Sequence, residues 1–216
     1  MTDSQGRFPL AEILAYRVVP VLVIRNAADA RAVGEALVNG GLPVVEVTLR
    51  TPASWDAVGE LKKVDGLIVG VGSVKSPEDI VRAKDEGLAF AVSPGLLAPI
   101  AEMAEKCQLS FLPGVSTPSE IMLALSLGFN VVKWFPAEAL GGITSLKAIA
   151  APFPDLKFVP TGGVNLSNMA SYLQEKFVSA IGGSWMVSAA LVESQNRAEM
   201  SGLTKSAIES ASQIGK

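Results

Sequence analysis

Apolar residues gather along the chain in short runs rich in valine, isoleucine and phenylalanine. The runs recur at intervals of roughly 20 to 27 residues, and each has the length of a strand. They are VVPVLVI, VVEVTL, LIVGVGSV, FAVSP, SFLPGV, VVKWFP, FVPTGG and AIGGSW. Continuous apolar runs are typical of parallel strands that are buried on both faces. We therefore expect eight parallel strands.

Helical patterns separate these runs. Segments such as 76–88 and 117–129 open with a residue that can cap a helix and close near a glycine. A strand followed by a helix, eight times over, predicts an α/β fold of the (β/α)8 TIM barrel type, with an open doubly wound sheet as the alternative. Residues 7–17 are expected to form an extra N-terminal helix, and residues 200–216 a final amphipathic helix.

The composition suits one barrel and a small-molecule ligand. The chain has 216 residues, of which 49% are hydrophobic and 18% charged, so residues 1–216 are expected to form a single domain. The net charge is -3 and the basic residues are scattered, which argues against nucleic acid or a membrane as a partner. The polar amino terminus is unlike a signal peptide, so we expect a cytoplasmic protein.

Histidine is absent from the chain, which excludes several kinds of active site. Activation of serine or cysteine by histidine is impossible, as is a metal site with histidine ligands. Acid–base chemistry must therefore fall to Glu, Asp, Lys or Tyr. The single cysteine, Cys107, cannot form an internal disulfide, and we interpret it as a core residue.

Lys133 interrupts an apolar run. The alternation of a strand places Lys133 and Phe135 on one face, and Val132 and Trp134 on the other. A buried ammonium is costly, and burial favours the neutral amine that attacks a ketone. The alternative is a lysine at a frayed strand end whose head reaches solvent. We predict that Lys133 forms a Schiff base with a 2-keto acid.

A second strand supplies groups that such a lysine would need. Alternation sends Glu46, Thr48 and Arg50 to one face of the run VVEVTLR. Glu46 and Arg50 could form a structural ion pair, but a carboxylate beside a lysine also suits proton transfer in imine chemistry. Arg50 and Ser73, the latter near the end of the third run, could bind the carboxylate of a keto acid.

Paired glycines follow the last two predicted strands. In PTGG and GGSW, the backbone N–H groups could converge on an anion, as in the phosphate sites of barrels. The alternative is a pair of tight turns that need positive φ. We expect Gly162, Gly163, Gly183 and Ser184 to bind phosphate.

Two other residues receive weaker predictions. Pro94, in VSPG, is expected to shape a loop and to line the keto-acid pocket. Glu138, in PAEALGG, is expected to be an acid at the start of a helix.

The motifs VEVTLR, VGVGSV, SPG, LPGVSTPSE, KWFPAE, PTGGV and IGGSW resemble the family of 2-keto-3-deoxy-6-phosphogluconate (KDPG) aldolases, also called 4-hydroxy-2-oxoglutarate (KHG) aldolases. The resemblance covers nearly the whole chain. It implies that Lys133 is the Schiff-base residue and Glu46 the acid–base residue. It also implies a homotrimer that needs no metal and no other cofactor.

The resemblance assigns further residues to the substrate. It maps the pyruvate carboxylate onto Arg50 and Ser73. We also expect Pro94 and Phe135 to contact pyruvate. Threonine is usual in the family at the position of Ser73; serine keeps the hydrogen-bond donor and loses a methyl group. Thr161 matches a position tied to stereochemistry at C4, which favours the gluconate substrate.

The resulting hypothesis is a class I aldolase that cleaves KDPG to pyruvate and glyceraldehyde 3-phosphate, and KHG to pyruvate and glyoxylate. One alternative is a phosphosugar isomerase or epimerase on the same barrel. Another is a non-catalytic module that senses a phosphorylated sugar acid. A sensor would keep the glycine loops but would not need Lys133 and Glu46.

Overall fold

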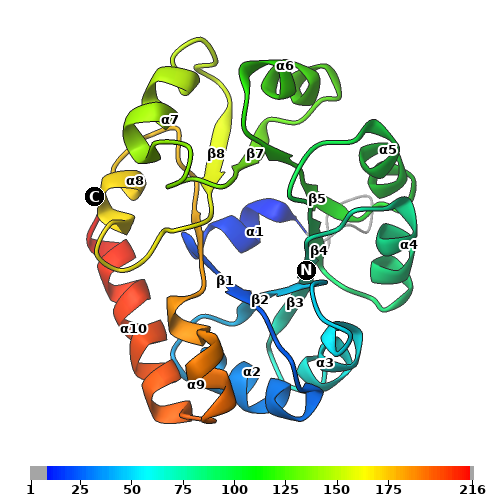
Figure 1. Ribbon diagram of the computed structural model, residues 1–216, viewed down its shortest axis with the longest axis vertical. Helices are drawn as coiled ribbons and strands as arrows, with labels where there is room; N and C mark the ends of the chain where they lie inside the picture. The colour runs from blue at the N-terminus through cyan, green and yellow to red at the C-terminus, as the bar shows by residue number, and fades with distance from the viewer. Residues whose placement is uncertain (1–8, 215–216) are drawn as a thin grey trace.

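Short parallel strands occupy the inside of the molecule. The computed structural model describes residues 9–214, and every strand pair in this range is parallel. Figure 1 shows the strands inside a ring of helices. The strands are β1 (Val18–Leu22), β2 (Val44–Thr48), β3 (Ile68–Gly72), β4 (Phe90–Val92), β5 (Ser110–Leu112), β6 (Gly114–Val115), β7 (Val131–Trp134), β8 (Lys157–Pro160) and β9 (Ile181–Gly183).

The strands form two curled sheets. One has the order β5-β4-β3-β2-β1-β9, and the other β6-β7-β8. Strands β5 and β6 both come from the run SFLPGV, which the sequence predicts to be one strand. Pro113 lies between them and has no backbone N–H for a ladder hydrogen bond. Isolated bridges at Phe158↔Val178 and Thr161↔Gly182 join β8 to the segment containing β9. The fold is therefore a parallel α/β fold.

Helices follow the strands along the chain, as the sequence predicts. They are α1 (Leu10–Leu14), α2 (Ala30–Asn39), α3 (Ser54–Leu61), α4 (Pro77–Asp85), α5 (Ala98–Lys106), α6 (Pro118–Ser126), α7 (Gly142–Ala150), α8 (Met169–Leu173), α9 (Ala189–Glu193) and α10 (Arg197–Gln213), with 3-10 turns η1 (Ala27–Asp29) and η2 (Trp185–Val187). The final helix begins before the predicted residue 200, and residues 7, 8, 215 and 216 of the two predicted terminal helices lie outside the described range.

The expected helix starts have the expected caps. The Ser76 hydroxyl accepts a hydrogen bond from the backbone N–H of Asp79 at 3.3 Å, and the Asp79 carboxylate accepts one from the backbone N–H of Ser76 at 3.2 Å. Thr117 accepts from the backbone N–H of Glu120 at 3.3 Å. These bonds satisfy amides that have no partner inside the helix. The local sequence thus determines where α4 and α6 begin.

The core lies between the sheets and the helices. Its largest fully buried side chains include those of Trp134, Tyr172 and Phe90. Cys107 is free and packs partly buried against this core, in line with the prediction. Among the described residues, no helix is both long enough and apolar enough to cross a membrane.

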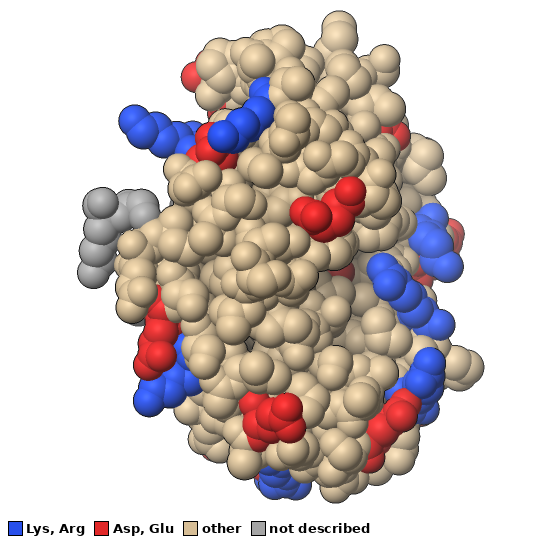
Figure 2. All heavy atoms as spheres, turned by 60° about the vertical axis from the view of Figure 1, so that its left-hand side comes forward, with Lys and Arg blue, Asp and Glu red and all other residues tan. Residues whose placement is uncertain are grey.

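The charged surface contains no large patch of one sign on the face drawn in Figure 2. Several charges pair with neighbours, as in Lys62–Glu86 at 3.0 Å and Arg25–Glu193 at 2.8 Å. Exposed pairs of this kind contribute little to stability. The scattered pattern agrees with the distribution read from the sequence.

Candidate active site

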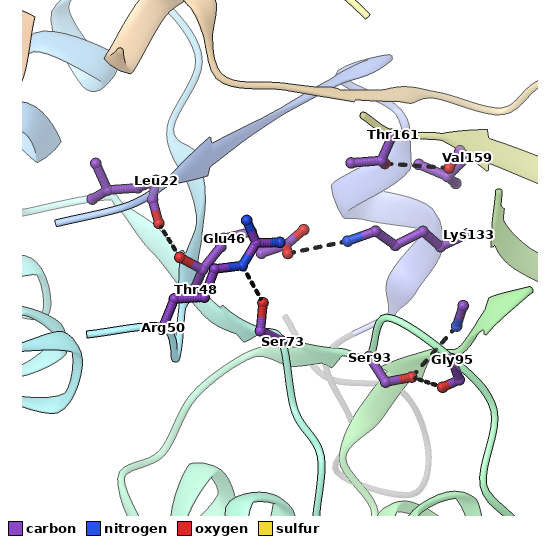
Figure 3. Close-up of polar contacts among 11 residues, drawn as sticks. Leu22, Glu46, Thr48, Arg50, Ser73, Ser93, Gly95, Lys133, Val159 and Thr161 are labelled. Carbon is purple, nitrogen blue, oxygen red and sulfur yellow. Dashed lines mark hydrogen bonds and ion pairs between the residues drawn. The ribbon is translucent and has the colours of Figure 1, made fainter. Parts of the chain in front are cut away.

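Lys133 on β7 and Glu46 on β2 meet inside the molecule. The distance from Lys133 Nζ to Glu46 Oε1 is 3.4 Å, and the two side chains are only 3% and 4% exposed. Figure 3 shows the two side chains pointing toward each other from different strands. A buried ion pair is often no more stabilising than apolar residues of similar size. Stability alone therefore does not explain this pair.

Gly72 makes room for the Glu46 side chain. Gly72 is the last residue of β3, the neighbour of β2. A Cβ atom on Gly72 would lie 1.9 Å from Glu46 Oε1 and 2.5 Å from its carboxyl carbon. No side chain larger than hydrogen fits there without moving the carboxylate. The missing side chain of Gly72 thus decides where the Glu46 carboxylate lies.

Strand β7 shows the alternation predicted from the sequence. Val132 and Trp134 are buried in the core, at 0% and 1% exposure. Lys133 points the other way, toward Glu46, and its Nζ lies 5.3 Å from the centre of the Phe135 ring. The ring therefore borders the amine, in a position to contact a molecule bound to it.

Arg50 lies past the end of β2, so the strand is shorter than the run VVEVTLR. Glu46 and Thr48 are strand residues, but Arg50 sits in the following turn and is exposed. Thr48 donates its hydroxyl hydrogen to the carbonyl oxygen of Leu22 at 2.9 Å. Arg50 Nε donates to Ser73 Oγ at 2.8 Å, which brings together the two residues expected to bind a carboxylate (Figure 3).

Ser73 has an unusual backbone conformation. Its φ angle is +59°, in the left-handed region that residues other than glycine rarely adopt. The residue is 7% exposed and follows β3 directly. Backbone conformations of this kind cluster at functional sites. Here the turn brings the hydroxyl to Arg50.

The PTGG turn is held by the loop after β7. The carbonyl oxygens of Thr161 and Gly162 accept hydrogen bonds from the backbone N–H groups of Ala137, at 2.8 Å, and Glu138, at 3.0 Å. In a trans peptide the C=O and N–H point in opposite directions, so the Gly163 N–H is directed away from that loop. Gly162 and Gly163 have φ angles of +99° and +83°, so the turn also needs glycine for its conformation.

The GGSW segment, whose two glycines belong to β9, lies beside the PTGG turn. An isolated bridge joins Thr161 to Gly182, and a Cβ on Gly182 would lie 2.4 Å from Thr161 Oγ1. Gly183 ends β9 with the Trp185 ring packed over it, since a Cβ there would lie 1.9 Å from Trp185 Cζ3. Ser184 is exposed at the following turn. The four residues expected to bind phosphate therefore lie on the PTGG turn and at the neighbouring end of β9.

Pro94 lies next to the strand that pairs with β7. It follows β4, and a Cβ on Gly114 would lie 2.3 Å from the Pro94 carbonyl oxygen. Gly114 is the register partner of Lys133. The neighbouring Ser93 hydroxyl donates to the Gly95 carbonyl oxygen at 2.6 Å and stabilises this turn.

Two features of the site escaped the sequence reasoning. Gly72 lies in the motif VGVGSV, but the sequence analysis assigns it no role. The alternation of residues along this strand could have shown which face Gly72 occupies. Tyr172 on α8 donates its hydroxyl hydrogen to Glu138 Oε1, a contact that no local pattern indicates. The expected helix-start position of Glu138 is wrong, because α7 begins at Gly142.

The site has an amine, a carboxylate and a guanidinium, but no metal-binding cluster. Among residues 9–214, no group of three or more His, Cys, Asp or Glu side chains could hold a metal ion. A hollow of about 680 Å³ elsewhere is lined by residues that include Leu109, Phe111, Leu127, Phe129 and Val131, and none of the candidate site residues lines it. The arrangement around Lys133 is suited to attack on a carbonyl group.

Comparison with known proteins gives consistent similarities. Residues 11–203 match the family model described as KDPG and KHG aldolase. The KHG/KDPG aldolase of Escherichia coli strain K12 is 42% identical over 195 residues, which cover 90% of this chain and 92% of that protein.

Two solved structures are similar over most of the chain. The 2-keto-3-deoxy-6-phosphogluconate aldolase of Zymomonas mobilis ZM4, solved with 3-phosphoglycerate, has a TM-score of 0.87 at 40% identity and covers 91% of this chain and 93% of that chain. The KDPG aldolase of Legionella pneumophila, with pyruvate captured as a covalent carbinolamine, has a TM-score of 0.88 at 38% identity and covers 91% and 97%.

Proposed function

Because the chain belongs to the KDPG and KHG aldolase family, we propose that Lys133 is the amine nucleophile with which this aldehyde-lyase cleaves KDPG to pyruvate and glyceraldehyde 3-phosphate. The observation that carries the assignment is the buried contact between Lys133 Nζ and Glu46 Oε1 at 3.4 Å. It supplies both a nucleophile and a group that can take its proton.

The first half of the reaction forms the imine. Glu46 accepts a proton from the Lys133 ammonium, and the free amine attacks the C2 ketone of the substrate to form a carbinolamine. Glu46 gives its proton to the carbinolamine hydroxyl, which leaves as water, so that the protonated imine forms and the carboxylate is restored. In the Legionella pneumophila relative, pyruvate is captured as a covalent carbinolamine. The chemistry proposed here is of the same type.

The second half breaks the bond between C3 and C4. Glu46 takes the proton of the C4 hydroxyl, the electrons of the C3–C4 bond move into the imine, and the aldehyde leaves. Protonation of the resulting enamine at C3 and hydrolysis of the imine release pyruvate and restore the amine. The carbons and protons balance without an oxidant, a reductant or a metal.

The remaining residues bind the two ends of the substrate. Arg50 and Ser73, linked at 2.8 Å, bind the carboxylate of the pyruvyl half. Pro94 and Phe135 contact its carbon atoms. Thr161 contacts the C4 hydroxyl and contributes to the choice of stereoisomer.

The phosphate group binds at the PTGG turn and the end of β9, through Gly162, Gly163, Gly183 and Ser184. Two observations support the proposal. The bridge between Thr161 and Gly182 sets the two glycine segments side by side. The hydrogen bond from the Glu138 N–H to the Gly162 carbonyl oxygen directs the adjacent Gly163 N–H away from the loop after β7. KHG has the same pyruvyl half but no phosphate, so we propose that it is cleaved less efficiently.

Covalent trapping tests the proposal. Wild-type protein incubated with pyruvate and borohydride is expected to gain one reduced pyruvyl adduct, located on Lys133 by mass spectrometry of peptides. The same preparation should release pyruvate from KDPG in a coupled assay. Cleavage without an adduct on Lys133 would exclude this mechanism. An isomerase or a sensor, the two alternatives from the sequence, would give no adduct.

Gly72→Ala tests the position of Glu46. The new methyl group would lie within 2 Å of Glu46 Oε1 unless the carboxylate moves, since the Cβ position is 1.9 Å away. A displacement of about 1 Å can cost about 10²-fold in rate, so kcat on KDPG is expected to fall by about that factor. Steady-state kinetics provide the measurement.

The matched control is Gly59→Ala on α3, where an added Cβ has no atom within 4 Å. Alanine is the better helix former, so this control should fold at least as well and keep its activity. An unchanged kcat in Gly72→Ala would show that the position of Glu46 tolerates the added methyl group and would weaken its assignment as the base.

We further propose that residues 1–216 form one domain in which the two sheets close into a (β/α)8 barrel. Support comes from the continuity of β5 and β6 through Pro113 and from the bridges at β8 and β9. Helix α1 is proposed to be the extra N-terminal helix that closes the amino end of the barrel. Its Ile13 and Leu14 are buried and, together with Glu46 and other core residues, line a small internal hollow.

A cytoplasmic homotrimer is the proposed form of the protein. Helix α6 presents exposed apolar side chains, among them Met122 at 64% and Leu125 at 42% exposure. Such a face is typical of a surface that is covered by another subunit. The single free cysteine agrees with a reducing compartment.

A further inference from the structure

Tyr172 and Glu138 form a contact outside the groups used in the mechanism above. Tyr172 lies on α8 and is 1% exposed, and its hydroxyl donates a hydrogen bond to Glu138 Oε1. Glu138 itself is exposed, in the loop between β7 and α7. The contact joins residues 34 positions apart in the chain. It therefore ties the loop after β7 to the helix that follows the PTGG turn.

Glu138 also holds the PTGG turn directly. Its backbone N–H donates to the Gly162 carbonyl oxygen at 3.0 Å. Its side-chain stem packs on Gly163, where an added Cβ would lie 2.6 Å from both Glu138 Cβ and Cγ. Glu138 thus contacts Gly162 through its backbone, Gly163 through its side-chain stem, and α8 through its carboxylate.

The other side of the turn is held by amide side chains. Asn165 Nδ2 and Asn168 Nδ2 donate to the Gly163 carbonyl oxygen at 3.2 and 3.1 Å. Asn168 Oδ1 accepts from the Asn165 N–H at 2.8 Å. Both asparagines precede α8, which begins at Met169. The orientation of the turn therefore depends on where α8 sits, and Tyr172 connects α8 to Glu138.

The Tyr172 hydroxyl is held in its protonated, donating form. Burial raises its pKa well above the ordinary value, and the hydrogen bond to Glu138 and the charge of that carboxylate raise it further. Gly142 leaves space over this contact, since an added Cβ would lie 3.3 Å from Glu138 Oε1 and 3.5 Å from Tyr172 Oη. The bond should persist over the pH range of an ordinary assay.

We propose that Tyr172 and Glu138 are positioning residues that hold the PTGG turn in the shape that binds the substrate phosphate. The inference rests on the proposed function, since it assumes that the glycine turns bind phosphate. Neither side chain is required to touch the reacting carbon atoms. Their loss should weaken binding of phosphorylated substrate and leave chemistry at Lys133 unchanged.

Tyr172→Phe provides the test, because it removes one hydroxyl and keeps the ring that packs in the core. Loss of one hydrogen bond to a charged but exposed acceptor is expected to raise KM for KDPG by about fivefold. The kcat for KDPG and the kcat/KM for KHG, which has no phosphate, should stay within about twofold of wild type. The borohydride adduct with pyruvate should form at the wild-type rate.

Companion variants separate positioning from general stability. Glu138→Ala should raise KM for KDPG at least as much as Tyr172→Phe, because it removes the same hydrogen bond and also the Cγ atom that packs on Gly163. The double variant should be no worse than Glu138→Ala alone. Glu138→Gln keeps an acceptor for the hydroxyl and should stay close to wild type. Tyr16→Phe, at the chain's other tyrosine, is the matched control and should behave as wild type.

Two results would overturn the proposal: an equal loss of kcat/KM for KDPG and KHG, which indicates general destabilisation, or an unchanged KM for KDPG in Tyr172→Phe. Failure of the proposed function is a separate outcome. In that case the wild-type protein itself would neither cleave KDPG nor trap pyruvate. The substrate comparison therefore tests the positioning role only in a protein already shown to be active.

Discussion

Lys133→Met is expected to lower kcat on KDPG by about 10⁴-fold or more, because removal of the nucleophile removes the covalent route entirely. Methionine has a similar length and no amine, so it fills the space without forming an imine. The measurement is release of pyruvate from KDPG, together with mass spectrometry after treatment with pyruvate and borohydride. The variant should show no adduct.

The substitution leaves the Glu46 carboxylate buried beside an apolar side chain. An unpaired buried charge is destabilising, so circular dichroism and thermal unfolding must show that the variant is folded before its kinetics are interpreted. The matched control is Lys157→Met at the start of the adjacent strand β8, where the lysine Nζ donates to the Lys176 carbonyl oxygen at the surface. A folded Lys133→Met protein that retained catalysis would refute the Schiff-base assignment.

Glu46→Gln is expected to give the second largest effect, a fall of about 10²- to 10⁴-fold in kcat on KDPG. Glutamine has nearly the same shape but cannot accept a proton from Lys133 or from the C4 hydroxyl. The imine should still form slowly, because the amine remains. Borohydride trapping of pyruvate is therefore expected to reach completion at a reduced rate.

This combination of slow trapping and nearly absent cleavage distinguishes a base from a merely structural carboxylate. Glu60→Gln, on the exposed face of α3 in a surface pair with Lys63, serves as the matched control and should leave both rates unchanged. Wild-type turnover in a folded Glu46→Gln protein would exclude Glu46 as the base. A normal trapping rate with impaired cleavage would restrict its role to the C3–C4 bond.

Lys133 and Arg50 show where the alternation of strand residues predicts the direction of a side chain and where it does not apply. Lys133 and Trp134 point to opposite sides because the pleat of β7 extends over both, as the sequence predicts. Arg50 was assigned by the same period of two, but β2 ends at Thr48 and the chain turns before Arg50. Side chains alternate between two faces only within a strand, and pairing with the neighbouring strands determines where a strand ends.

The run SFLPGV also forms less continuous structure than its apolar pattern predicts. The apolar run correctly predicts an extended segment in the sheet, yet the ladder is interrupted at Pro113 and two strands result. Proline lacks the N–H that a continuous ladder needs. For the glycine pairs, the alternative interpretation as tight turns that need positive φ holds for Gly162 and Gly163 only, since Gly183 ends β9 without a positive φ angle.

The sequence by itself determined the parallel α/β class, the starts of capped helices and membership in the aldolase family, and it predicted Lys133 and Glu46 as the reactive groups. These follow from local periods, capping and motifs, which depend on residues close together in the chain. Only the tertiary structure decided that Lys133 Nζ and Glu46 Oε1, 87 positions apart, lie 3.4 Å from each other.

The tertiary structure also decided that Gly72 leaves the space for Glu46, and that Tyr172 joins α8 to the loop carrying Glu138. Contacts between distant segments depend on how the sheets curve and on which strands become neighbours. The curvature of a sheet depends on the twists of many strands and on the volumes of many side chains, and it cannot be predicted from a short stretch of sequence.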